Sequence, residues 1–258
     1  LALLTLLTLL PTSALAASGS GTGIKATTDP NLWSTRLTST GQQYSYRPPM
    51  AAGKQLYCMD LGYSYRYGTA SFLNSYSYTS ATGADADALW EKAAAKTGLG
   101  EMDAAVKENV KWMMTYIVNY TGEIPGSLFM ALQTYIWDNQ SDKSAGGDTS
   151  GDIDAVCEKT LAAGHAGFRG GDTSGDIDAG GFANRDTYET YLGYVDWLLA
   201  QKAKEDAEYQ QQIEDYAAKG IIAAVVEDES AKWAVYAKSS VSGRQSFFAY
   251  YAPRKLQI

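Results

Sequence analysis

The sequence predicts an α+β fold, in which strands from both ends of the chain form an antiparallel sheet or barrel beside a helical middle section. Three observations support this prediction. Residues 32–67 alternate Tyr, Thr and Leu with polar residues, which is typical of short strands. Residues 85–139 are rich in helix formers with apolar positions at helical spacing. Residues 220–252 return to β-branched and aromatic residues. Strands, then helices, then strands favour the α+β class.

The first residues have the composition of a secretion signal. Residues 1–16 are an apolar run that ends in small residues, so we interpret them as a signal peptide that lacks its own start. The run is too short to span a bilayer, and we expect no membrane insertion after its removal. Residues 17–30 are rich in Gly, Ser and Thr and are expected to be a flexible lead-in. Residues 31–258 are then one domain, with an insert rich in Asp and Gly at about 141–185.

Three helices are predicted in the middle section. The first covers residues 85–98 and ends at Gly98. The second covers residues 101–122 and ends at Gly122, with one apolar face formed by Val106, Val110, Met113 and Ile117. The third covers residues 127–139, with Ser127 as its N-cap.

A long helix and three strands follow the insert. Asp186 and Glu189 form a capping-box pattern that begins a helix ending at Gly220, and its charged second half predicts a surface position. The strands are expected at residues 220–226, 232–238 and 245–252. The last two form a hairpin around Ser242 and Gly243. The closing strands need a partner surface, and the early strands supply it.

Charge and composition exclude several functions. The formal net charge of −8 argues against a nucleic-acid partner and favours basic, amine-bearing ligands. The chain has one His and two scattered Cys, which cannot supply the ligands of a zinc site. We therefore expect no metal and no cofactor.

Gln133 interrupts the apolar face of the third helix. Phe129 lies four residues before it, and Ile136 and Trp137 lie three and four residues after it, so all four share one face. Burial of an amide without partners costs about 1–3 kcal/mol. Gln133 is therefore hydrogen-bonded, exposed or chemically altered, and a hydrogen-bonded glutamine is the simplest of these interpretations.

Cys58 lies in a predicted strand within "QLYCMDLGY", residues 55–63. Leu56 and Asp60 share its strand face, whereas Tyr57 and Met59 point the other way. A disulfide to Cys157, the second cysteine of the chain, is one possible pairing.

"YCMD" at Cys58 and "LQTYIW" at Gln133 together resemble the thioester domains of Gram-positive cell-surface adhesins. Those domains carry a cysteine in a short apolar strand and, further along, a glutamine in a motif of the form T/L-Q-x-x-I-W, which Ile136 and Trp137 complete here. The separation is 75 residues (133 minus 58). The resemblance extends to the order of elements over most of the mature chain. Leu132 stands where family members often have Thr.

The resemblance implies an internal thioester between Cys58 and Gln133. A lysine amine of a host or matrix protein would open this bond and form a stable amide crosslink, so the domain would be a single-use covalent binder and not an enzyme. Tyr57, Phe129 and Trp137 would shield the bond from water. The resemblance also implies a secreted protein on the bacterial cell surface, as part of a longer wall-anchored chain.

Two alternatives stay open. The segment "GGDTSGDIDA" occurs at residues 146–155 and again at 170–179, and its alternate Asp and Ser residues resemble the ligands of calcium loops. Lys159 and Ala183 stand where such loops need a bidentate acid, so calcium affinity is expected to be weak. A calcium-dependent, non-covalent binding module with a Cys58–Cys157 disulfide is the first alternative. The second is a Cys/His hydrolase that uses His165, although His165 lies in a Gly-rich segment typical of a loop.

Overall fold

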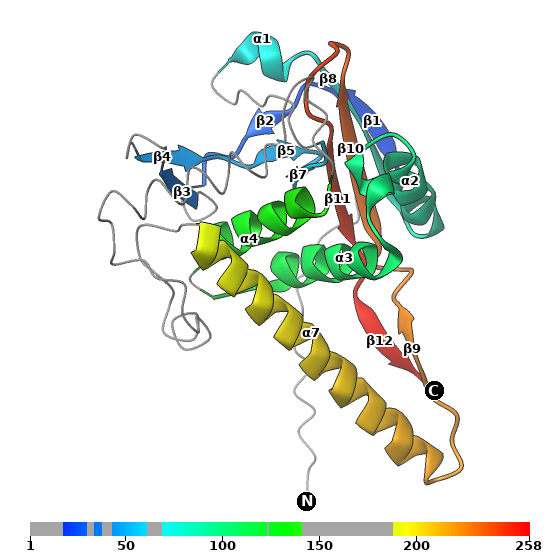
Figure 1. Cartoon of the computed structure of the whole chain (residues 1–258). Coiled ribbons are helices and arrows are strands. Elements are labelled where there is room, and N and C mark those ends of the chain that lie inside the picture. The colour runs from blue at the N-terminus through cyan, green and yellow to red at the C-terminus, as the bar shows by residue number, and fades with distance from the viewer. Residues whose placement is uncertain (1–17, 30–33, 38–42, 61–68, 123, 141–187) are drawn as a thin grey trace, which may run out of the picture.

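The computed structural model describes residues 18–29, 34–37, 43–60, 69–122, 124–140 and 188–258. Its central feature is a five-stranded antiparallel sheet with the strand order β1-β8-β10-β11-β7 (Figure 1). The strands of this sheet are β1 (Gly19–Thr22), β7 (Tyr57–Cys58), β8 (Tyr76–Thr82), β10 (Trp233–Ser239) and β11 (Phe247–Tyr251). Strands from the two ends of the chain therefore share one sheet, and the predicted α+β fold class is confirmed. Within the described residues the sheet is open, with β1 and β7 at its edges, and does not close into a barrel.

Helices from the middle of the chain pack on this sheet. Helix α2 contacts β8 and β10, helix α3 contacts β11, and helix α4 packs against α3 and α7. The bounds are α1 (Ala70–Leu73), α2 (Ala84–Ala94), the 3₁₀ helix η2 (Gly98–Glu101), α3 (Ala104–Asn119), α4 (Pro125–Asp138) and α7 (Tyr188–Ala217). One core results, because apolar residues of the sheet and of all four long helices form a single buried cluster.

Three smaller sheets lie beside the central one. The first pairs β9 (Ala224–Glu227) with β12 (Arg254–Gln257). The second has the order β2-β5-β6, from Lys25–Ala26, Pro49–Ala51 and Lys54–Gln55. The third pairs β3 (Ser34–Leu37) with β4 (Gln43–Tyr46).

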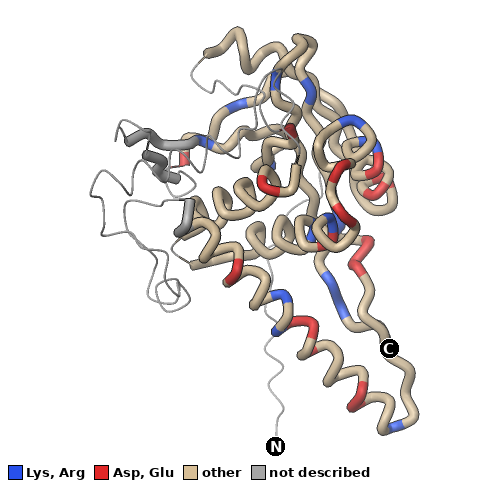
Figure 2. Tube along the Cα trace, in the orientation of Figure 1, with Lys and Arg blue, Asp and Glu red and all other residues tan. Residues whose placement is uncertain are grey.

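Helix α7 extends from the body of the molecule. Its first half buries Tyr191, Tyr194, Val195 and Leu198, and no residue beyond Leu198 in this helix is fully buried. Figure 1 shows its second half reaching the region of the β9–β12 sheet, and Figure 2 shows both acidic and basic residues along it. The predicted surface position of the charged half is thus confirmed. Asp186, the first residue of the expected capping box, lies outside the described residues.

The predicted hairpin near the C-terminus is confirmed. Strands β10 and β11 pair antiparallel, and Gly243 in their connection has a φ of 72°, a left-handed conformation that favours glycine. Four strands were not predicted from the sequence. Two of them, β1 and β2, lie within the expected lead-in at residues 17–30. The others are β8, which pairs with both β1 and β10, and β12 at the C-terminal end.

Three local expectations are corrected. Residues 17–30 are not simply a flexible lead-in, because Gly19–Thr22 forms the edge strand β1. Pairing to β8 uses backbone N–H and C=O groups, which Gly and Ser possess like every residue other than proline. Helix α2 ends at Ala94 and not at Gly98, since the Thr97 hydroxyl donates to the Ala93 carbonyl and accepts from the Leu99 amide to begin η2. Ser127 is not the N-cap of α4, because Pro125 occupies the first helical position.

Candidate functional site: a buried cysteine–glutamine pair

Cys58 lies at the edge of the central sheet with its backbone polar groups turned away from the neighbouring strand. Cys58 is opposite Phe247 in the pairing of β7 with β11. The next residue, Met59, donates its N–H to the Ser246 carbonyl on the β11 side, at 2.8 Å. Backbone groups alternate between the two edges of a strand, so the N–H and C=O of Cys58 face the open edge. Both groups are buried there and need partners.

The side-chain amide of Gln133 satisfies both groups. The Cys58 N–H donates to Oε1 of Gln133 at 2.7 Å, and Nε2 of Gln133 donates to the Cys58 carbonyl at 2.9 Å. Cys58 is 1% exposed and Gln133 is 0% exposed. The carboxamide therefore takes the place that a peptide group of a further strand would occupy.

Helix α4 carries Gln133 into the core because it is apolar almost all round. A helix of this kind is stable only when other elements cover it, and here α3, α7 and β3 pack against it. Its buried residues are Gly126, Leu128, Phe129, Met130, Ala131, Leu132, Gln133, Thr134 and Ile136. Gln133 is thus a polar side chain in a nearly apolar environment, and its hydrogen bonds to Cys58 offset the cost of burial.

Tyr57 and Phe129, two of the three aromatic residues expected around the pair, contact each other. The rings of Tyr57 and Phe129 stack with centroids 4.3 Å apart and an interplanar angle of 14°. Burial raises the pKa of Tyr57 well above its ordinary value, so its phenol stays neutral. Trp137 lies one turn beyond Gln133 on α4 and is half-buried against the same core. Its indole N–H has no hydrogen-bond partner among the described residues.

Asp60 fixes the chain directly after Cys58. Its carboxylate accepts from the backbone N–H of Gly98 at 3.1 Å and of Ser246 at 3.0 Å. Its own N–H donates to Oε1 of Gln245 at 3.1 Å. These bonds tie β7 to η2 and to the start of β11. Because every one of them is buried, the strand that carries Cys58 has little freedom to move.

Tyr76 lies within electrostatic reach of Cys58. Its pKa is raised, first by burial and to a smaller extent by the negative charge that Cys58 would carry as a thiolate. Its hydroxyl donates to the Gln245 carbonyl at 2.9 Å. Tyr76, Gln245 and Asp60 were not identified as site residues from the sequence. Only Asp60 had a visible signal, since it shares the strand face of Cys58.

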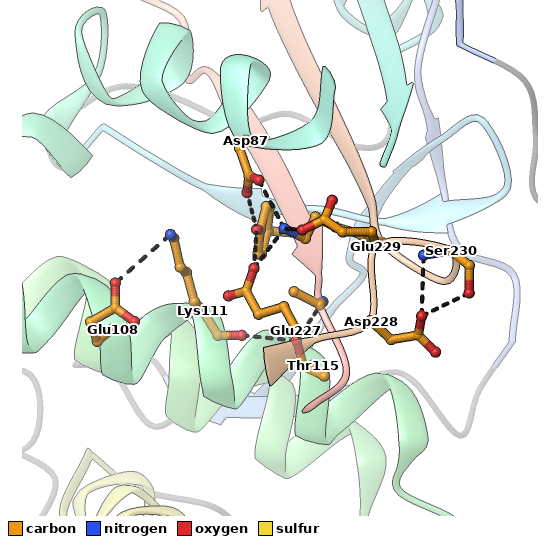
Figure 3. A network of polar contacts seen from close by, with 11 residues as sticks. Asp87, Glu108, Lys111, Thr115, Glu227, Asp228, Glu229 and Ser230 are labelled. Carbon is orange, nitrogen blue, oxygen red and sulfur yellow. Dashed lines mark hydrogen bonds and ion pairs between the residues drawn. The ribbon is translucent and has the colours of Figure 1, made fainter. Parts of the chain in front are cut away.

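A second polar cluster lies between α2, the end of β9 and the start of β10. The ammonium of Lys232, 1% exposed, contacts Asp87 at 2.8 Å, Glu227 at 2.6 Å and Glu229 at 2.7 Å. Figure 3 shows these three carboxylates converging from α2, β9 and the turn after β9. Their oxygens lie within 4.8 Å of one another, close enough to hold a metal ion. Lys232 already supplies the positive charge at this point, so we interpret the cluster as an ion-pair network.

The alternatives to a thioester depend on residues outside the described ranges of the chain. Cys157, His165 and both copies of the Asp-rich repeat lie within residues 141–187. The Cys58–Cys157 disulfide, the Cys/His hydrolase and the weak calcium loops therefore stay predictions.

Comparison with known proteins does not assign the chain to a family. The chain matches no protein-family model, and no curated protein and no solved structure is significantly similar to it. Among the described helices, none combines the length and apolar character needed to cross a membrane. The functional argument consequently rests on the residues themselves and on the contacts that they make.

Proposed function

We propose that Cys58 and Gln133 form an internal thioester, and that the protein is an adhesin domain that captures a target-protein amine through this bond. One observation carries the proposal: the carboxamide of Gln133 is held against Cys58 by two hydrogen bonds in a fully buried site. The target would be a lysine of a host or matrix protein. The setting would be the bacterial cell surface, as the resemblance to adhesin thioester domains implies.

The first step joins the two side chains. The sulfur of Cys58 attacks the side-chain carbonyl carbon of Gln133, and a bond forms between sulfur and carbon. The carbon–nitrogen bond of the amide breaks, the thiol proton passes to the leaving nitrogen, and ammonia departs. No oxidant, metal or cofactor takes part in this exchange.

The hydrogen bonds of the site favour this attack. The Cys58 N–H points at Oε1, where negative charge develops in the tetrahedral intermediate, and so acts as an oxyanion donor. The bond from Nε2 to the Cys58 carbonyl fixes the orientation of the leaving amine. Amides resist thiols in water, and holding the reacting groups in attack geometry can lower the barrier by about 7–11 kcal/mol.

Burial protects the product from hydrolysis. The stacked rings of Tyr57 and Phe129 and the apolar face of α4 surround the pair. A target amine then attacks the Gln133 carbonyl, Cys58 leaves as a thiol, and an amide joins the two proteins. The domain is consumed in this step, so the activity is covalent binding and not catalysis.

Intact mass and amine trapping test the proposal. Fresh, never-reduced protein is expected to weigh one ammonia less than its sequence requires. Methylamine is expected to add its full mass at Gln133 and to leave a Cys58 thiol that reacts with iodoacetamide. Peptide mapping locates both changes.

Three variants serve as controls. Cys58→Ala is expected to restore the calculated mass and abolish the reaction with methylamine, and Gln133→Ala to abolish it as well. Cys157→Ala is expected to change neither result. A loss of two hydrogens in place of one ammonia would instead identify a disulfide, and a calculated mass with Cys58 alkylated from the start would refute the proposal.

A further inference from the structure

A pocket of about 430 Å³ lies at the end of the molecule where α3, α7 and the β11–β12 corner meet. Its volume falls within the range of about 300–1,000 Å³ that small-molecule sites occupy. Its lining includes Trp112, Tyr116, Asn119, Thr121, Glu205 and Arg254.

The pocket is separate from the cysteine–glutamine pair. Cys58 is opposite Phe247 at the start of β11, whereas Ala252 of the pocket follows the end of that strand. Five residues of strand separate the two positions, which is about 17 Å. A ligand in the pocket therefore leaves the proposed thioester site unobstructed.

Aromatic side chains of α3 form one wall. The rings of Trp112 and Tyr116 stack with centroids 4.8 Å apart, and Trp197 meets Tyr116 edge-on at 5.8 Å. The Tyr120 ring lies directly over the α-carbon of Gly122, where a Cβ would collide with it. Because Gly122 has no side chain, the Tyr120 ring can occupy this position.

The charged groups of the opposite wall neutralise one another. Glu205 accepts from the indole of Trp112 at 2.7 Å and from Nε of Arg254 at 3.2 Å. Nη2 of Arg254 lies 3.0 Å from the same carboxylate at an angle that makes an ion pair and not a hydrogen bond. Arg254 also pairs with Asp206, which in turn pairs with Lys202. Two cations and two anions balance here.

This wall disfavours charged ligands. An anion would meet Glu205 and the negative end of the α3 dipole, because the last turn of α3 carries no basic residue. A cation would meet Arg254, which already lines the pocket. At the rim, the exposed Asn119 and Thr121 offer an amide and a hydroxyl. Oδ1 of Asn119 accepts from the Tyr251 hydroxyl at 3.1 Å, and its NH₂ group remains to donate to a ligand.

We propose that this pocket binds a neutral sugar. A pyranose ring presents an apolar C–H face to the aromatic side chains and hydroxyl groups to Asn119, Thr121 and the carbonyl end of α3. It carries no charge that the balanced wall would repel. The proposal goes beyond covalent capture and does not depend on the thioester.

Saturation-transfer NMR with lactose and with N-acetylglucosamine tests the proposal on the full chain. We expect saturation transfer to at least one of the two sugars at millimolar concentration. Cys58→Ala is expected to bind with the same affinity, so that failure of sugar binding and failure of the thioester can be told apart.

Variants locate the binding. Gly122→Ala displaces the Tyr120 ring and Asn119→Ala removes a rim amide; each is expected to weaken binding about three- to tenfold. Val118→Ala, an exposed position on the same helix that does not line the pocket, is the matched control. Absence of saturation transfer, or equal affinity in all three variants, would overturn the proposal. Binding of a proline-rich peptide in place of both sugars would overturn it too.

Discussion

At the scale of single residues, the side-chain amide of Gln133 replaces the backbone hydrogen bonds of a neighbouring strand. It occupies the open edge of β7 and makes there the two hydrogen bonds that a neighbouring peptide group would make. Asp60, which follows Cys58 closely in the chain, has a comparable role, because its carboxylate accepts from two backbone N–H groups. Side chains in place of backbone thus complete the hydrogen bonding at this edge of the sheet.

Loss of the Gln133 amide is expected to destabilise the fold even where no thioester can form. In a Cys58→Ala background, Gln133→Met keeps the length of the side chain but leaves the N–H and C=O of residue 58 buried without partners. We expect a loss of about 1–3 kcal/mol in the free energy of unfolding, measured with urea. Gln210→Met on the exposed half of α7 is the control, with a change within about 0.5 kcal/mol. Equal stability of the Gln133→Met protein and its parent would contradict this account.

At the scale of elements, Lys232 joins α2, β9 and β10 through ion pairs with Asp87, Glu227 and Glu229. Burial alone would lower the pKa of Lys232, but its hydrogen bonds to the three carboxylates outweigh burial and raise it. Burial likewise acts to raise the pKa of Asp87, but hydrogen bonds from Lys232 and Tyr250 outweigh it and lower that pKa below its ordinary 3.8. Lys232 and Asp87 are therefore both charged at neutral pH.

Lys232→Met is expected to lower stability by about 1–3 kcal/mol, less than for a fully buried pair because the three carboxylates are partly exposed. Asp87 has its lowered pKa only in the folded protein. The stabilisation that ionised Asp87 contributes is therefore complete above roughly pH 5 and is lost as the pH falls through its folded pKa. The difference in free energy of unfolding between the wild-type and Lys232→Met proteins should consequently shrink in acid. Urea unfolding at several pH values measures it, with the exposed Lys238 of the same strand, as Lys238→Met, for control. A difference independent of pH would exclude Asp87 from the effect.

Helix α7 is an element with two unlike halves. Its 30 residues span about 45 Å, and only the half up to Leu198 contributes fully buried side chains. The second half is joined to the β9–β12 sheet by polar contacts, among them the Arg254 ion pairs and the hydrogen bond from Tyr209 to the Arg254 carbonyl.

Hydrogen exchange should therefore differ along α7. Backbone amides after residue 202 are expected to exchange faster than those of residues 191–199, since opening of the second half exposes little apolar surface. Arg254→Gln should accelerate exchange around Glu205 and Tyr209 and leave the first half unchanged. Mass spectrometry of peptides from exchanged protein measures this, and uniform protection along the helix would be inconsistent with it.

At the scale of the whole molecule, the proposed thioester would join the first half of the chain to its helical middle. Cys58 and Gln133 are separated by 75 residues, and a covalent link between them restricts the unfolded chain. By the relation used for disulfides, a loop of this length corresponds to about 4.5 kcal/mol of stabilisation.

Opening of the thioester by methylamine is consequently expected to lower the free energy of unfolding by up to about 4.5 kcal/mol while the fold is kept. Urea unfolding of treated and untreated protein compares the two forms, and circular dichroism checks that the fold is unchanged. Cys58→Ala treated in the same way should show no change. Equal stability of the closed and opened forms, in protein whose mass proves the bond, would show that the link does not restrict the unfolded chain as expected.

Local patterns in the sequence were enough to predict the fold class, the helices of the middle section and the hairpin of β10 with β11. Each of these depends on residues close in sequence: helical spacing of apolar residues, β-branched and aromatic runs, and a glycine with positive φ at Gly243. Gln133 was identified in the same way, as a polar residue on an apolar helix face. Cys58 was paired with it through the resemblance to thioester domains.

Only the tertiary structure decided which distant segments meet. Strand β1 has a sequence typical of a linker, and it is a strand because the backbone of β8 lies beside it. Asp60 meets Gln245 across 185 residues, and no local pattern marks that contact. The pocket that Trp112 and Arg254 line likewise combines α3, α7 and the residues after β11. Short-range sterics and burial determine the periodicity of apolar residues within an element. Contacts between elements depend on how all of the elements pack around one core, and no local sequence pattern specifies this packing.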